Sequence, residues 1–188
     1  MLHRIKEYGK YAEITGFKGI KFVQAESFLK ANRKETQPNI ELQFFDAGLV
    51  ATQEHLYFAI LNALQAFRNK TNISKSLAVE TMLYASAQRQ IRKAIQRCGI
   101  KTETTSMAAV IIGENPAEVK TLLEAITVCV GAEPDETVLE MNEVKLEKIK
   151  EAFQVKAEEI KTLMKNGNRN EAVVSLVVER VALLATQL

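Results

Sequence analysis

The sequence has few aromatic residues and few cysteines. Phenylalanine, tyrosine and tryptophan together make up 6% of the 188 residues, and tryptophan is absent, which argues against an aromatic cage for a cofactor. The two cysteines, Cys98 and Cys129, lie far apart and outside any CxxC pair, so they provide no disulfide framework. We expect both thiols to be small buried hydrophobic groups.

Signals of membrane insertion, export and catalysis are also missing. No apolar stretch reaches the roughly 18 residues needed to span a bilayer, and the N-terminal MLHRIKEYGK lacks the apolar segment of a signal peptide. We therefore expect a soluble, cytoplasmic protein. The sequence contains no GxxxxGK[ST] phosphate loop, no HExxH, no GxSxG and no GxGxxG after a strand. These absences predict a protein that is not an enzyme and that binds no metal or other cofactor.

Three side chains remain as candidates for acid–base chemistry. His3 lies in a terminus that we expect to fray. His55 lies in the first turn of an apolar helix, where a general base is conceivable but a structural or interface role is the favoured interpretation. Glu80 could act as a base, although a carboxylate among cations more often pairs with an arginine and orients it. No second polar group with a defined role accompanies Glu80, so we favour the structural interpretation there too.

The charges are distributed unevenly, although the net charge is only +2. Residues 1–54 carry 8 Lys/Arg and 7 Asp/Glu, residues 55–102 carry 8 Lys/Arg and one acid, Glu80, and residues 103–188 carry 9 Lys/Arg and 15 Asp/Glu. The three segments therefore have net charges of +1, +7 and −6. A centre this positive predicts a surface for a polyanion, and the acidic remainder limits that surface to one part of the molecule.

Apolar spacing and capping residues predict an α+β fold in a single domain over residues 1–188. We expect one mixed or antiparallel sheet packed with helices, and a helical C-terminal third. Strands are expected within residues 10–20, at 40–46, at 79–85 and at 107–113. Helices are expected within 22–34, at 53–67 after Thr52, at 87–98 after Ser86, from Asn115 to about Gly131, and within 142–165 and 171–188.

The predicted helix over residues 87–98 carries most of the central positive charge. Arg89, Lys93 and Arg97 recur every four residues on one face, and Arg92 lies beside them. The apolar stripe that we expect to face the core consists of Ile91, Ala94, Ile95 and Cys98.

Three features favour a nucleic-acid surface over a merely solvated helix face. Cations continue upstream, so two separate elements could converge on one surface. Glutamine side chains both donate and accept hydrogen bonds, which suits base edges as well as phosphates. Ser86 and the first N–H groups of the predicted helix would form an anion site. The upstream cations are Arg68, Lys70 and Lys75, and the glutamines are Gln88, Gln90 and Gln96.

A single-stranded end fits this surface better than a duplex does. A recognition helix for the major groove would have to protrude, whereas this helix has an apolar stripe for the core. Lysine and arginine would hold phosphates, while glutamines, Tyr84 or guanidinium planes would meet unstacked bases.

Two consecutive stretches resemble a known family. IELQFFDAGLVATQEHLYFAILNALQAF, followed by NISKSLAVETMLYASAQRQIRKAI, closely resembles the small tRNA-binding subunit of the archaeal KEOPS complex, in the PRPK-binding protein family. The close match covers about residues 40–112. The resemblance implies a non-catalytic subunit that contacts the kinase-like ATPase of the complex and captures the 3′ CCA end of tRNA. The complex's threonylcarbamoyl transferase subunit then modifies adenosine 37, so capture acts as a tether.

The sequence departs from the family pattern at two positions near the expected RNA-binding residues. Ala87 stands where relatives have glycine, and at positive φ an alanine would cost about 1 kcal/mol and could tilt the helix start. Lys75 stands where some relatives have arginine, so the charge is kept but the bidentate fork is lost. The expected RNA-binding residues are Lys75, Ser86, Gln88, Arg89, Gln90, Arg92 and Lys93.

The kinase-like partner requires a second surface. The last predicted helix has an apolar stripe too wide for packing on one side only, unless another helix covers it. We expect Val177, Val181 and Leu184 to bind the partner, with the 53–67 helix next in line. A purely structural activator of a kinase-like protein, without RNA contact, is the alternative function, and a free-standing enzyme is the third.

Overall fold

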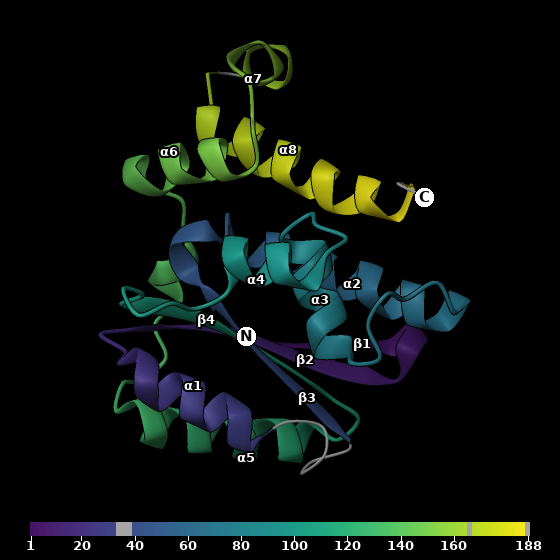
Figure 1. Ribbon diagram of the computed structural model, residues 1–188, viewed down its shortest axis with the longest axis vertical. Coiled ribbons are helices and arrows are strands. Elements are labelled where there is room, and N and C mark those ends of the chain that lie inside the picture. The colour runs from purple at the N-terminus through teal and green to yellow at the C-terminus, as the bar shows by residue number, and fades with distance from the viewer. Residues whose placement is uncertain (33–38, 165–166, 187–188) are drawn as a thin grey trace.

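The computed structural model describes residues 1–32, 39–164 and 167–186 of the chain. Within these residues one four-stranded sheet has the order β1-β2-β4-β3, and its neighbouring strands are all antiparallel. Helices cover both faces of the sheet, and a further helical layer lies at the C-terminal end (Figure 1). The predicted α+β class is confirmed. The strands are β1 Leu2–Ile5, β2 Lys10–Lys18, β3 Ile40–Asp46 and β4 Ser106–Gly113.

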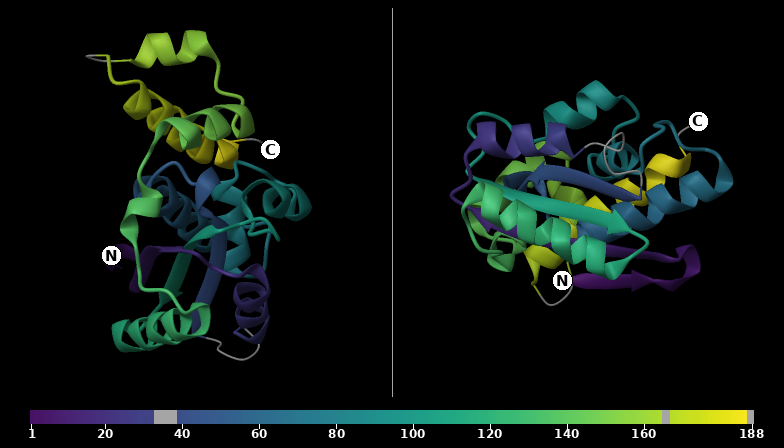
Figure 2. Two further views of the ribbon diagram at one scale, coloured as in Figure 1. Left: turned by 90° about the vertical axis from the view of Figure 1, so that its left-hand side faces the viewer. Right: turned by 90° about the horizontal axis from the view of Figure 1, so that it is seen from below.

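The helices form three groups, which the left view of Figure 2 shows as layers stacked from top to bottom. One face of the sheet is covered by α1 Phe22–Ala31 and α5 Pro116–Val130. The other face is covered by α2 Gln53–Asn69 and α3 Leu77–Ala85, with α4 Ile91–Cys98 against α3. The outer layer contains α6 Glu143–Ala152, α7 Ala157–Leu163 and α8 Arg169–Leu183. Within the described residues, no helix combines the length and apolar character required to cross a bilayer.

Strand β4 lies inside the sheet and is apolar on both faces. Because side chains alternate between the two faces of a strand, one that is covered on both sides reads as a continuous apolar run. This run, at residues 107–113, correctly predicted a buried strand. On one face, β4 packs Ala108, Val110 and Ile112 into the core that it shares with α2 and α8. On the other face, it packs Met107, Ala109 and Ile111 into the core that it shares with α1 and α5.

Side-chain caps explain why two helices begin where the sequence predicted. The Thr52 hydroxyl accepts a hydrogen bond from the His55 N–H at 3.4 Å, and α2 starts there. The Asn115 amide oxygen accepts from the Ala117 N–H at 2.9 Å at the start of α5, and Gly131, at φ +65°, ends that helix. Each cap satisfies an N–H group that has no partner inside the helix.

The predicted strand at 79–85 is wrong, because this segment is helix α3. Its side chains are buried almost all the way round, between the sheet, α2 and α4. A helix without a polar face has no helical periodicity to reveal it, so a short apolar run can be either helix or strand. The N-cap is Ser76, whose hydroxyl accepts from the Val79 N–H at 3.3 Å. The following helix, α4, begins at Ile91 rather than at residue 87.

Two further expectations about single residues differ from the structure. His3 does not lie in a frayed end, since it pairs with Ala12 in the β1–β2 ladder and its ring lies 4.9 Å from that of Tyr57. Cys98 is fully buried as expected, but Cys129 is only partly buried, on α5.

The C-terminal third is helical, as predicted, and packs on α2 through α8. The expected helix within 142–165 is two helices, α6 and α7, separated at Gln154, which has a φ of +54°. Arg180 of α8 holds α7 through an ion pair with Glu159 at 3.0 Å. Residues 33–34, 165–166 and 187–188 of the expected helices lie outside the described residues.

Candidate nucleic-acid interface

The turn between α3 and α4 has a specific backbone geometry. After Ser86 ends α3, Ala87 adopts a φ of +49°. The Ala87 N–H donates to the Tyr84 carbonyl at 2.9 Å, and the Gln88 N–H donates to the Leu83 carbonyl at 3.0 Å. These two bonds are the Schellman motif, in which the left-handed residue is usually glycine. The alanine noted in the sequence therefore stands at a position that glycine would occupy with less strain.

Ser86 does not form the predicted anion site. Its side chain is fully buried, and its hydroxyl donates to the Leu83 carbonyl at 3.1 Å. The residue closes α3 instead of capping the next helix, whose N-cap position is Gln90 and carries no side-chain capping bond. Ser86 thus shapes the turn from inside.

Two side chains from elsewhere in the chain hold the carbonyls of this turn. Arg97 donates from Nη1 to the Ser86 carbonyl at 2.8 Å. His55 donates from Nε2 to the Ala85 carbonyl at 2.7 Å, while its Nδ1 accepts from the Ala51 N–H at 3.1 Å. These partners require the neutral imidazole with its proton on Nε2.

Both of those side chains also contact Phe153, at the end of α6. The His55 ring meets the Phe153 ring edge-on with centroids 5.5 Å apart, and the Arg97 guanidinium lies 5.5 Å from the same ring. Burial lowers the pKa of His55 to about 4, against the hydrogen bond to Ala85 that acts in the opposite direction. His55 is therefore neutral near pH 7 and has the structural role that the sequence favoured.

Glu80 also has a structural role, but its partner is not an arginine. Its buried carboxylate accepts from the Ile73 N–H at 3.0 Å and from the Ser74 N–H at 2.7 Å. Glu80 therefore shapes the loop between α2 and α3, which carries Lys75. The predicted pairing with an arginine is wrong, because the Glu80 carboxylate accepts its hydrogen bonds from backbone N–H groups of this loop.

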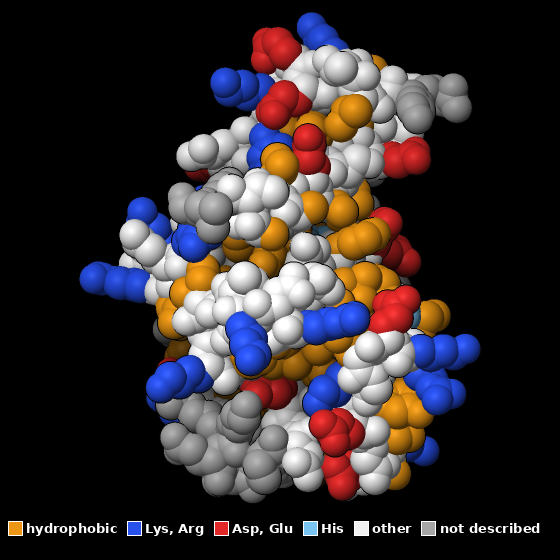
Figure 3. Space-filling model, turned by 90° about the vertical axis from the view of Figure 1, so that its right-hand side faces the viewer, with side chains coloured by type: hydrophobic (Ala, Val, Ile, Leu, Met, Phe, Trp, Pro, Cys, Tyr) orange, Lys and Arg blue, Asp and Glu red, His pale blue; other side chains and the backbone are white. Residues whose placement is uncertain are grey.

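The structure brings most of the predicted RNA-binding residues onto one surface. Arg89 and Gln90 in the turn, and Arg92 and Lys93 on α4, are all exposed. Lys75 is exposed on the α2–α3 loop, next to Ser76, which lines the same cavity as Ile95 of α4. On the side of the molecule drawn in Figure 3, exposed apolar side chains lie among Lys and Arg side chains, with Asp and Glu side chains to their right and below.

Other cations and one glutamine lie differently. Arg68 lies over the Tyr8 ring at 6.0 Å and so faces the β1–β2 hairpin rather than α4. Lys70 ends α2. Gln88 is partly buried and donates one amide N–H to the Ala87 carbonyl at 2.9 Å, so its second N–H and its amide oxygen remain for a ligand.

Ile91 and Ile95 of α4 are functional candidates that sequence reasoning misplaced. They were expected in the core, but 41% and 51% of their surfaces are exposed. Only Ala94 and Cys98 of this helix point inward. The apolar pattern alone could not tell these two pairs apart, because both repeat every four residues.

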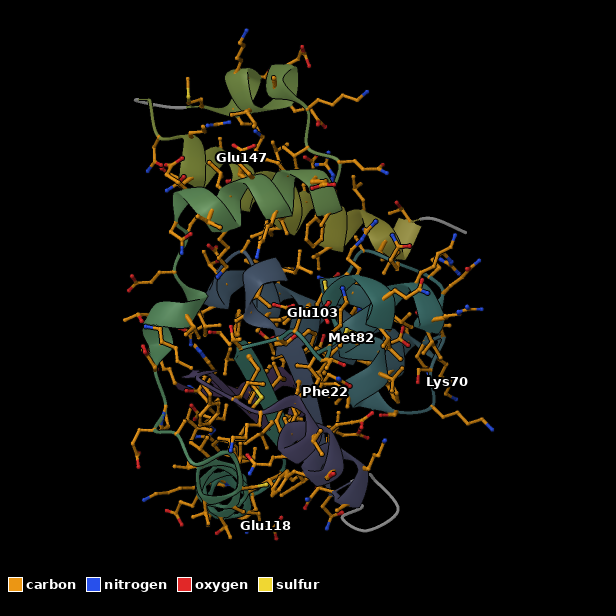
Figure 4. The ribbon with its side chains drawn as sticks, turned by 60° about the vertical axis from the view of Figure 1, so that its left-hand side comes forward. Phe22, Lys70, Met82, Glu103, Glu118 and Glu147 are labelled. Carbon is orange, nitrogen blue, oxygen red and sulfur yellow. The ribbon has the colours of Figure 1, made fainter. Side chains whose placement is uncertain are left out.

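Ile95 lies at the edge of a cavity of about 500 Å³ between α1, β3, α3 and α4, whose lining is mostly apolar but includes Glu26 and Glu41. Met82 of α3 and Phe22 of α1 line it too, and Figure 4 shows their positions on neighbouring elements. α4 therefore presents cations and apolar surface side by side.

The residues predicted to bind a partner are buried. Val177, Val181 and Leu184 all lie in the core formed with α2, with at most 3% of their surfaces exposed. Helix α2 covers the wide apolar stripe of α8, so these residues pack in the core instead of facing a partner. Leu183, with 46% exposed, is the large apolar side chain that the described part of α8 presents to solvent.

The structure defines an α+β protein in which one short helix presents cations beside exposed apolar side chains. The described residues hold no group of three or more His, Cys, Asp or Glu side chains that could hold a metal ion. Residues 20–185 match the family described as Kinase binding protein CGI-121, and the chain belongs to this family. A relative, the regulatory protein Cgi121 of Methanocaldococcus jannaschii, is 32% identical over 145 residues, which cover 77% of this chain and 83% of the relative. The family resemblance seen in the sequence is confirmed.

Replacing Ala87 with glycine should stabilise the protein. Glycine adopts positive φ without the steric cost of a Cβ, so we expect the free energy of unfolding to rise by about 1 kcal/mol. Urea denaturation followed by circular dichroism measures this. Ala85→Gly, two residues earlier in ordinary helical geometry, is the matched control and should destabilise the fold. A loss of stability in Ala87→Gly would contradict the assigned turn.

The buried imidazole predicts a loss of stability in mild acid. The unfolded chain takes up a proton on His55 near pH 6.5, whereas the folded chain resists until about pH 4. Stability is therefore lost as the pH falls from 6.5 to 4, by up to about 3 kcal/mol. Because the protein's carboxyl groups also affect stability in acid, the test isolates His55 by comparing urea denaturation of the wild type with that of His55→Gln. Equal pH dependence in both proteins would rule out the neutral, buried His55.

Proposed function

We propose that this protein is a non-catalytic subunit that holds the single-stranded 3′ CCA end of a tRNA on α4 and on the turn before it. A second surface binds a kinase-like ATPase. The observation that carries the RNA half is the combination of exposed Arg92 and Lys93 with exposed Ile91 and Ile95 on one short helix. Cations attract the phosphates, and apolar side chains accept the faces of unstacked bases.

The shape of the surface favours a strand end over a duplex. The helix α4 has eight residues and packs against α3 with a cavity beside it, so it does not project far enough to enter a major groove. We place an unstacked base at the mostly apolar cavity next to Ile95. Because the exposed cations are few, we expect about 3 phosphates to be neutralised and a slope of log K against log salt near −2.

Binding of the partner is supported by the family, whose name describes kinase binding. On this chain we place that contact at the exposed face of α8 around Leu183. Val177, Val181 and Leu184 then act from beneath, by fixing α8 on α2. With the RNA end held at α4 and the partner at α8, the protein would raise the effective concentration of tRNA near a catalytic subunit that installs threonylcarbamoyl on adenosine 37.

Charge reversal at Arg92 should weaken RNA binding. We expect Arg92→Glu to lower the affinity for tRNA at least about tenfold and to make the salt dependence shallower, because a phosphate contact is lost. Fluorescence anisotropy with intact and CCA-trimmed tRNA measures both effects. Lys120→Glu on α5, across the sheet, is the matched control and should bind as the wild type does.

A second variant separates base contact from charge. Ile95→Ser should weaken binding several-fold through lost apolar contact and leave the salt dependence unchanged. Equal binding of intact and trimmed tRNA would rule out recognition of the 3′ end. No RNA binding at all, with kinase-like partner binding intact, would establish the purely structural activator instead.

The partner contact is tested on α8. Leu183→Asp should reduce capture of the kinase-like ATPase subunit in a pull-down with purified proteins, because the exposed apolar side chain leaves the interface. Val128→Asp on α5, a residue that is 83% exposed, is the control for an apolar surface elsewhere. If Leu183→Asp binds its partner like the wild type, the contact lies on another face.

A further inference from the structure

A second groove lies on the other flank of α4, opposite the apolar cavity. Its volume is about 650 Å³, and it is bounded by α4, by the short helix η2 Ala47–Leu49 and by α6. The polar side chains that line it from the central segment of the sequence are Gln88, Lys93, Gln96, Arg97 and Lys101, and Lys148 lines it from α6.

This groove is strongly cationic. Four of its lining side chains are positively charged, and the one acid among them is Glu151. In the described part of the chain, the ammonium groups of Lys93, Lys101 and Lys148 form no ion pair with a carboxylate. Arg97 is already held by the Ser86 carbonyl and the Phe153 ring, so it contributes charge from a fixed position.

Lys148 is the unexpected member, because it comes from the acidic third of the sequence. Its ammonium lies 4.0 Å from the place that a Cβ on Gly48 would take. The side chain therefore reaches from α6 to η2, whose Leu49 also lines the groove. The fold thus adds a cation to the basic surface from a segment whose net charge has the opposite sign.

The two flanks of α4 differ in chemistry. Ile95 lines the mostly apolar cavity, and Ile91 lies one turn before it on the same side of the helix, whereas Lys93 and Arg97 lie one turn apart on the flank with the cationic groove. Gln88, in the turn between α3 and α4, also lines the cationic groove. It lies next to Arg89 and Gln90 in the same turn, so the groove adjoins the predicted RNA-binding residues.

We propose that this groove binds the sugar–phosphate backbone of the RNA strand on the 5′ side of the terminal bases, with Lys101 and Lys148 as phosphate contacts. The inference rests on the proposed function. The terminal bases lie against Ile91 and Ile95, the strand crosses α4 at Arg92 and Gln96, and its upstream phosphates lie among the lysines of the groove. Cations without acidic partners, beside glutamine amides, match a phosphodiester chain better than an apolar peptide.

The test uses two RNA probes and the full chain. One probe is a tetranucleotide that ends in CCA, and the other is a single strand of about twelve nucleotides with the same 3′ end, within the range of lengths that single-strand sites cover. The double variant Lys101→Gln, Lys148→Gln removes two charges from the groove. Its matched control, Lys120→Gln, Lys161→Gln, removes two charges from exposed positions on α5 and α7.

We expect the groove variant to bind the tetranucleotide like the wild type but the longer strand more weakly. The slope of log K against log salt for the longer strand should become shallower by about 1.4, since each single-strand phosphate contributes about 0.7. Between 50 and 200 mM salt, this change of slope corresponds to about a sevenfold smaller loss of affinity. The control variant should match the wild type with both probes.

The other outcomes separate this inference from the function on which it rests. If the wild type binds both probes and the groove variant matches its control, the groove is not part of the RNA path and the proposed function stands. If the groove variant loses the kinase-like partner while RNA binding is unchanged, the groove is a protein contact and the inference is overturned. If the wild type binds neither probe, the proposed function fails and the inference fails with it.

Discussion

The surface around α4 depends on how the turn before it is held. That turn has a left-handed residue, Ala87, which by itself favours another conformation, and it is stabilised by contacts to its carbonyls. Arg97 binds the Ser86 carbonyl and His55 binds the Ala85 carbonyl, and both side chains meet at Phe153. Because Phe153 ends α6, the outer helical layer contributes directly to the position of the turn. The candidate RNA surface and the C-terminal helices are therefore parts of one packed structure.

With the turn held in this way, α4 lies between two surface depressions of different chemistry. The cavity lined by Ile95 is mostly apolar, and the groove lined by Lys93 is cationic. An RNA end carries the same two chemistries, since its bases have apolar faces and its backbone is charged. The other half of the proposed function is supported by the family, whose description is that of a kinase-binding protein. On α8, whose apolar side is buried and whose Arg180 contacts α7, the large apolar side chain that remains exposed is Leu183.

Much of the fold followed from local signals. Alternating apolar residues predicted β3, the continuous run predicted β4, and Thr52 and Asn115 marked the starts of α2 and α5. These signals are local, because a cap bonds an N–H only two or three residues away and strand side chains alternate between faces from one residue to the next. Helix α3 escaped prediction because it is buried on all sides and lacks a polar face. Ser86 was misassigned for a related reason: a serine between two helices can end one or begin the next, and only the packing decides.

The sequence by itself determined the class of fold, the position of the positive charge in the middle third and the family. It also identified Ala87 as a departure from glycine, since that depends on one residue type at one position. Tertiary structure alone decided that Ile91 and Ile95 face outward, that Val177 and Val181 face inward, and that Lys148 joins the basic groove. The physical reason is that burial and charge neighbourhood depend on which elements pack together, and residues distant in the chain supply that packing.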